Sequence, residues 1–145
     1  MKYISLGKLL LPQLDGVSYK PSTIRHKDET WLMVEMEKRI GKQAIRMSAN
    51  AITPNKGGLA SIVKMFPNPT GLVSATYTTF RGRKAHREIC LVRGADNQKR
   101  YTIRLAFEEK ERTYILSCIA LESIKKPAIQ LWERFLKEIK ENPTP

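Results

Sequence analysis

The chain has 145 residues, of which 41% are hydrophobic and 28% are charged. This length suits one domain, and the hydrophobic content excludes disorder along the whole chain because it can form a core. The 26 Lys and Arg residues outnumber the 14 Asp and Glu residues, which leaves a formal net charge of +12. A charge of this sign attracts polyanions, and nucleic acid is the usual polyanion for a soluble protein.

The N-terminal segment differs from a signal peptide and from a membrane span. Its longest apolar run is residues 9–11, which lie between Lys8 and Pro12, and this run is too short for either role. The two cysteines, Cys90 and Cys118, lie in apolar runs of strand length and are typical of buried thiols in a reducing compartment. We therefore expect a soluble protein without a membrane partner, located in the cytoplasm and associated with the nucleoid or with a ribonucleoprotein.

The first half of the chain combines turn signals with two competing periodicities. Prolines and a glycine interrupt residues 12–22, where we expect irregular structure. Residues 28–50 alternate with period two but also place apolar residues at helical spacing, so periodicity leaves both strand and helix open. Gly41 favours a hairpin, and we favour strands because a hairpin would extend the sheet predicted below. A short helix is expected around residues 59–66, stopped by Pro67 and Pro69.

The second half predicts an antiparallel meander closed by a helix. Residues 72–80 are rich in β-branched and aromatic side chains, residues 86–93 follow, and residues 100–107 alternate between apolar and polar. Residues 113–121 form a fourth run of strand length. Apolar residues then recur at helical spacing over residues 127–141, with Pro127 suited to a first helical turn.

The acidic residues are unevenly distributed along the sequence. None occurs between Glu37 and Glu88, whereas ten basic residues do. A surface that serves only solubility mixes both signs, so this one-signed interval indicates a polyanionic ligand. The segment 80–87 reads as a basic loop or hairpin tip that can share one side of the sheet with the 93–104 hairpin. The candidate nucleic-acid-binding residues are Lys38, Arg39, Lys42, Arg46, Arg81, Arg83, Lys84, Arg87, Arg93, Lys99, Arg100 and Arg104.

Aromatic residues are interleaved with these charges. Bases stack on exposed rings of sheet surfaces that bind single strands, and Tyr77 and Phe80 are the candidates for this role. They have opposite parity, so at most one can stack while the other packs. Tyr101 shares its parity with the apolar residues of its strand and is expected in the core.

The sequence shows no pattern of a catalytic or metal site. His26 and His86 are far apart, and we expect both to be exposed surface residues; neither fits a zinc-ligand spacing. Phosphate-loop and nucleophile-elbow motifs are absent. A metal-dependent nuclease could use Asp96 with Glu108 and Lys110, but the strand between Asp96 and the other two separates its ends by roughly 25 Å, so the three groups cannot share one metal ion. We therefore expect no catalytic residue, metal or cofactor.

These observations predict an α+β protein in which an antiparallel meander is covered by a C-terminal amphipathic helix. Residues 1–141 form a single domain, and residues 142–145 a flexible tail. The expected function is non-catalytic binding of DNA or RNA, with single strands favoured over duplex DNA. The alternative is an adaptor that docks on a ribonucleoprotein or an acidic protein through its C-terminal helix and tail, and a nuclease is third. A free sheet edge also predicts a homodimer or higher homo-oligomer.

Overall fold

A computed structural model describes residues 1–65 and 71–143. Ten strands and two α-helices are present in this part of the chain. They are, in order, β1 (Tyr3–Leu6), β2 (Leu9–Pro12), β3 (Val17–His26), β4 (Glu29–Ile40), β5 (Gln43–Thr53), α1 (Gly58–Met65), β6 (Leu72–Phe80), β7 (Arg83–Arg93), β8 (Lys99–Glu108), β9 (Thr113–Leu121), a 3-10 turn (Glu122–Ile124), α2 (Lys125–Glu138) and β10 (Lys140–Glu141).

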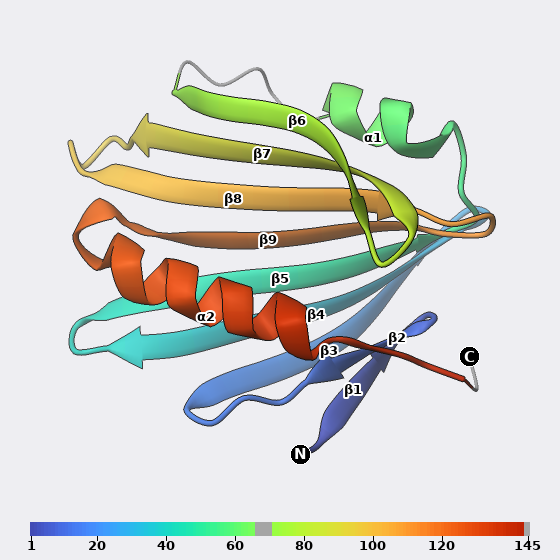
Figure 1. The fold of residues 1–145 in the computed structure, drawn as a ribbon, viewed down its shortest axis with the longest axis horizontal. Helices are drawn as coiled ribbons and strands as arrows, with labels where there is room; N and C mark the ends of the chain where they lie inside the picture. Colours follow the sequence, from blue (N-terminus) through green and yellow to red (C-terminus); the bar gives the residue numbers. More distant parts are fainter. Residues whose placement is uncertain (66–70, 144–145) are drawn as a thin grey trace.

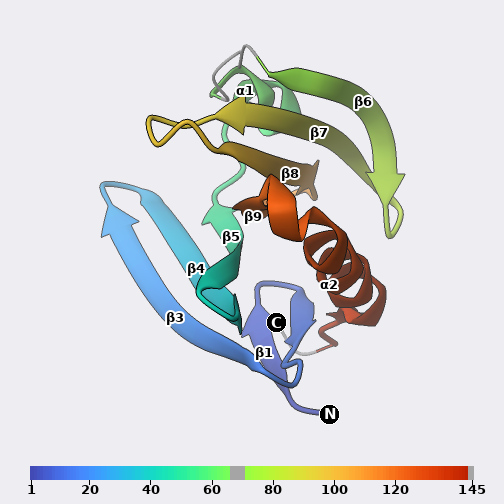
Figure 2. The same cartoon turned by 90° about the vertical axis from the view of Figure 1, so that its left-hand side faces the viewer.

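Seven strands form one curved antiparallel sheet in the order β3-β4-β5-β9-β8-β7-β6 (Figure 1). The crossover from β5 to β9 joins the hairpin of the first half to the predicted meander. Helix α2 lies against the concave side of the sheet, which we call the inner face, and α1 packs on the opposite, outer face (Figure 2). The small sheet β1-β2-β10 closes one end of the inner layer. This arrangement confirms the predicted α+β architecture.

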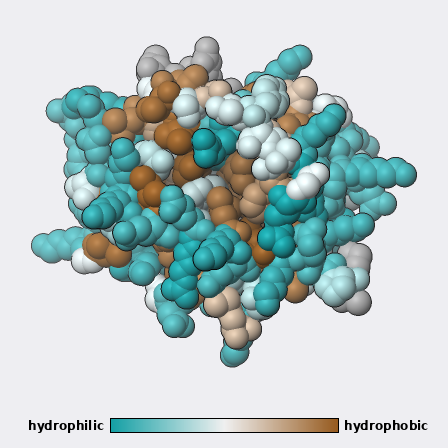
Figure 3. All heavy atoms as spheres, in the orientation of Figure 1, coloured by the Kyte–Doolittle hydropathy of each residue, from teal (hydrophilic) through white to brown (hydrophobic). Residues whose placement is uncertain are grey.

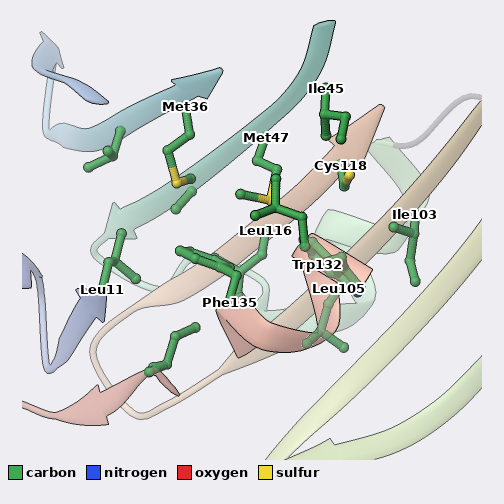
Figure 4. Close-up of a cluster of buried hydrophobic side chains, with 14 of the residues drawn as sticks. Leu11, Met36, Ile45, Met47, Ile103, Leu105, Leu116, Cys118, Trp132 and Phe135 are labelled. Atoms are coloured by element: carbon green, nitrogen blue, oxygen red, sulfur yellow. The ribbon is translucent and has the colours of Figure 1, made fainter. Parts of the chain in front are cut away.

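The core lies between α2 and the inner face. Ile103 and Leu105 of β8 face it because successive strand residues alternate between the two sides, and Leu116 of β9 faces it for the same reason. From α2, Phe135 is fully buried and lies beside these strands (Figure 4). Full burial of such a side chain contributes about 1.5–3 kcal/mol. The apolar stripe of α2 therefore packs inside the domain.

The ambiguous segment 28–50 is β-structure, as β4 and β5, with Gly41 at a positive φ of 61° in the turn. The expectation of irregular structure over residues 12–22 was wrong in part, because Val17 to His26 pair with β4 along their whole length. Strand pairing overrode the local signal of Pro21, which an edge strand tolerates. The short helix is confirmed over Gly58–Met65, and its expected stop lies outside the described residues.

The end of the chain differs from the prediction. Helix α2 ends at Glu138, and the next residues form β10, which pairs with β2. Asn142, expected in the flexible tail, donates its backbone N–H to the carbonyl of Lys8 at 2.8 Å. Its side chain also donates to the carbonyl of Gly7 at 3.3 Å. Residues 140–142 are thus fixed to the N-terminal hairpin rather than free in solution.

Candidate nucleic-acid interface

The turns divide the sheet into two ends. The turn at residues 41–42 and the turn between β7 and β8 lie at one end, which we call the 41–42 end. The turns at residues 27–28, 81–82 and 109–112 lie at the other, the 81–82 end. Strand β7 runs from one end to the other, a length of roughly 30 Å for its residues. The tip of the 80–87 segment and the turn of the 93–104 hairpin therefore lie at opposite ends of the sheet, although Lys84 and Arg104 both lie on its outer face.

Four of the predicted basic residues converge on the outer face at the 41–42 end. They line a depression of about 280 Å³ together with Ile119 and Leu121 of β9. Arg46 of β5 lies opposite Ile119, and Arg100 of β8 lies opposite Leu121, so the two arginines flank β9 from both sides. We call this set the basic cluster: Arg39, Lys42, Arg46 and Arg100.

The depression continues along the outer face toward β3. A second hollow of about 500 Å³ shares Arg46 and Ile119 with the first and is also lined by Lys20. Its floor carries Ser48 and Ser117, whose hydroxyl oxygens are 2.7 Å apart across β5 and β9. We call the two hollows together the outer trough. Its hydroxyl and guanidinium groups are the donors that phosphate oxygens accept from.

Two carboxylates moderate the charge of the outer trough. Glu35 and Glu37 line it from β4, and Arg39 donates to Glu37 over 3.4 Å. The side chains of Lys42 and Arg46 make no ion pair or hydrogen bond within residues 1–65 and 71–143. These two cations are accordingly the members of the basic cluster that are free to meet an anion.

Asp96 sits beside the basic cluster and holds Arg100 in a fork of two hydrogen bonds, 3.0 and 2.8 Å long. These bonds, followed by one from the N–H of Gln98, lower the pKa of Asp96 to about 2. The same pair raises the pKa of Arg100. Arg100 is thus oriented and partly neutralised by a neighbour that an incoming phosphate would have to displace or share.

The other predicted residues of this region have separate places. Arg93 donates to the side-chain and backbone oxygens of Asn97, at 2.9 and 3.1 Å. Arg104 faces the outer side with its guanidinium 3.8 Å from Glu88. Lys99 is exposed at the start of β8, whereas Lys38 has the inner-face parity of Ile45. Lys99 also has inner-face parity, that of Tyr101 and Ile103, so it lies on the side of the sheet opposite the trough.

The segment around Gly82, expected as a basic loop or hairpin tip, is a tight hairpin. Arg81 and Gly82 both have positive φ, 50° and 79°, as a two-residue turn between right-twisted strands requires. Strand β7 begins directly afterwards, at Arg83. The hairpin tip is thus the form that the segment takes, and because the strand alternation extends to the turn itself, its basic residues point to both faces.

The four cations of this hairpin consequently form no common surface. Arg83 is only 11% exposed and pairs with Glu109 at 3.3 Å and Glu141 at 2.9 Å. Arg81 lies 3.5 Å from the same Glu141. Lys84 is exposed on the outer face, and Arg87 is exposed on the inner face. Arg83 is a structural residue here, and we leave it out of the binding surface.

The aromatic candidates lie away from the outer trough. Tyr77 is 67% exposed on the outer face of β6, with its ring against His86 at 4.7 Å. Phe80 faces inward and packs on Phe107, also at 4.7 Å between ring centres. Tyr101 is buried in the core, as predicted. The expectation that His86 is an exposed loop residue was wrong, because it is buried on β7.

A further hollow lies on the inner side, between α2 and strands β6 to β8. It has a volume of about 310 Å³, an apolar lining that includes Trp132 and Leu136, and Arg87 and Glu133 at its rim. Figure 3 shows the corresponding hydrophobic side chains exposed above the hydrophilic surface of α2. Because Arg87 and Glu133 carry opposite charges, this groove has no preference for a polyanion.

The carboxylates of the nuclease hypothesis lie at opposite ends of β8. Asp96 pairs with Arg100 at the 41–42 end, while Glu108 accepts the backbone N–H of Leu59 at 2.7 Å. Within the described ranges, no group of three or more His, Cys, Asp or Glu residues is placed to hold a metal ion. The helices of the same ranges are too short or too polar to cross a bilayer.

Sequence reasoning missed Lys20, Ser48 and Ser117 as parts of the trough. The available signal was parity: Ser48 lies two residues from Arg46, on the same side of β5. The pairing of β5 with β9, which joins residues almost seventy positions apart, has no local signature.

No family model matches this sequence, and no curated protein matches it either. A solved structure that it resembles is that of LpqN, which is involved in cell envelope biogenesis of Mycobacterium tuberculosis. The two share 12% sequence identity with a TM-score of 0.62, and the match covers 93% of this chain and 83% of that chain. At this identity the likeness concerns the fold alone: the chain has the fold of LpqN, a curved antiparallel sheet packed around a C-terminal helix.

Proposed function

We propose that this protein binds nucleic acid without catalysing a reaction, and that the outer trough holds the phosphate backbone. The observation that carries the proposal is the convergence of the basic cluster from two separate parts of the chain, residues 39–46 and Arg100, onto one hollow. Like charges brought together by folding repel one another, and a polyanion relieves this repulsion.

The composition of the outer trough favours contacts to phosphate over contacts to bases. Arginine and serine side chains are suited to phosphate oxygens, and Arg46 with Ser48 and Ser117 offers both groups within one hollow. The aromatic rings that would stack bases lie elsewhere. The preferred ligand is therefore an extended backbone, DNA or RNA, bound with little dependence on sequence.

The test is a titration of labelled single-stranded DNA, duplex DNA and RNA by fluorescence anisotropy at several salt concentrations. The double variant Lys42→Ala/Arg46→Ala should weaken binding and reduce the slope of log affinity against log salt by about two, one for each lost phosphate contact. Neither side chain has an ion pair among the described residues, so the variant should fold as the wild type does.

A matched control removes the same charge elsewhere. Lys126→Ala/Lys137→Ala deletes two exposed lysines of α2, the helix on the inner side of the sheet, and should leave the salt slope nearly unchanged. Equal losses of affinity in both double variants would mean that only net charge matters and would contradict binding at the outer trough. Equally tight binding of polyglutamate would instead support the adaptor alternative, in which the partner is an acidic protein.

A further inference from the structure

The two edges of the seven-stranded sheet differ in their defences against pairing. Strand β3 forms one edge and carries Lys20, Pro21 and Arg25. Proline removes a backbone donor and charges disfavour an approaching strand, which is how natural sheets block an edge. Strand β6 forms the other edge, and its nine residues contain neither a charge nor a proline. Within the described residues, only β7 pairs with it.

The lack of charge on β6 is unusual for this chain. No charged residue occurs between Lys64 and Arg81, although 28% of all residues are charged. Large apolar or aromatic side chains of this strand also remain in solvent: Leu72 is 44% exposed, Val73 65% and Tyr77 67%. Val92 of the adjacent strand is exposed beside them. An edge of this kind is a template for another strand.

We propose that β6 is the seam of a homodimer, in which the β6 strands of two copies pair antiparallel and join their sheets into one. Charge favours a second copy as the partner of this edge. The chain has a net charge of +12, so two copies repel each other over most of their surfaces, but β6 is a long edge strand without cations of its own. Pairing of β6 in one copy with β3 of the next would propagate into a fibre, and the blocked β3 edge prevents it. The association therefore closes at two copies.

A two-fold axis through Thr76, the central residue of β6, gives the longest overlap of the two strands. Tyr77 of one copy then lies opposite Ala75 of the other on the outer face, a large ring over a small residue. On the inner face Thr76 meets its own copy, and threonine pairs stabilise antiparallel sheets. Leu72 and Phe80 share a register position at each end of the seam, but the register shift between Leu72 and Ser74 places Leu72 on the outer face, whereas Phe80 faces inward.

The test measures mass by sedimentation over a range of protein concentrations and exploits the self-pairing of residue 76. The wild type should approach twice 16.6 kDa as concentration rises. Thr76→Lys and Thr76→Glu should each remain at 16.6 kDa, since like charges then face each other across the axis. An equimolar mixture of the two variants should recover the dimer because lysine then faces glutamate.

The matched control is Thr23→Lys, an equally exposed edge position on β3, which should dimerise like the wild type. A wild type that stays at 16.6 kDa at every concentration would overturn the proposal and leave the β6 edge to a strand of another protein. A dimer that persists in Thr76→Lys would place the seam elsewhere and overturn it equally. Neither result bears on nucleic-acid binding, which rests on the outer trough and not on β6.

Discussion

Replacing Arg83 with alanine separates a structural role from a binding role for the basic hairpin. Arg83 connects three parts of the chain: its own strand, Glu109 in the turn after β8, and Glu141 in β10. Glu109 is also held by Arg112 and by the hydroxyl of Tyr114, each at 3.0 Å. Burial is the main cause that raises the pKa of Tyr114 to about 12, so its hydroxyl stays a donor to Glu109.

The magnitude follows from what the substitution leaves behind. The pair of Arg83 and Glu109 is largely buried, with side-chain exposures of 11% and 14%, and a hydrogen bond to a charged group contributes about 1.5–3 kcal/mol. Removing one member of a fully isolated buried pair costs about 3–5 kcal/mol, but Glu109 keeps Arg112 and Tyr114. The exposed contact to Glu141 adds at most about 1 kcal/mol. We expect Arg83→Ala to lower the free energy of unfolding by about 2 kcal/mol.

Urea unfolding followed by circular dichroism measures this change as a lower midpoint at an unchanged slope. A thermal scan should show a decrease of about 5–10 °C. Arg93→Ala, at the other end of the same strand, is the control and should change stability by less than about 0.5 kcal/mol. A wild-type unfolding midpoint in Arg83→Ala, together with a tenfold loss of nucleic-acid affinity, would refute the structural role and place this guanidinium against the ligand.

Three further results follow from the structure. Trp132→Ala should cost about 3–5 kcal/mol in urea unfolding, because this side chain is only 3% exposed; a negligible loss would mean that the stripe of α2 is not core. Asp96→Asn should raise nucleic-acid affinity by releasing Arg100, and it should also make the free energy of unfolding less dependent on pH in acid. Folding lowers the pKa of Asp96 from 3.8 to about 2. The stabilising contribution of this carboxylate is therefore complete above its unfolded-state pKa and is lost as the pH falls through its folded-state pKa. An acid-unfolding profile of Asp96→Asn identical to that of the wild type would contradict this pairing. Burial raises the pKa of Cys118 to about 12 and also raises that of Cys90, so a thiol reagent should label both only as fast as the protein unfolds; rapid labelling of the native protein would place a thiol at the surface.

Several features were readable from the sequence because they depend on local order along the chain. Alternation in residues 100–107 identified β8 and placed Tyr101 in the core, and the apolar spacing around Trp132 identified α2 and its buried side. Both inferences use the fixed periods of strands and helices, which hold wherever the element is placed. In residues 28–50 both periods fit, so the choice between strand and helix depended on the sheet that these residues join.

Tertiary structure decided which basic residues meet. Arg46 and Arg100 lie near each other because their strands, β5 and β8, both pair with β9. No local pattern encodes this arrangement. Arg81 and Lys84 are close in sequence to the candidates of the 93–104 hairpin, yet a strand of eleven residues carries them to the other end of the sheet. Strand order also made β6 an edge and gave Arg83 two carboxylate neighbours. Charge and periodicity can be read along the chain. A binding surface cannot, because it is formed by residues that only long-range strand pairing brings together.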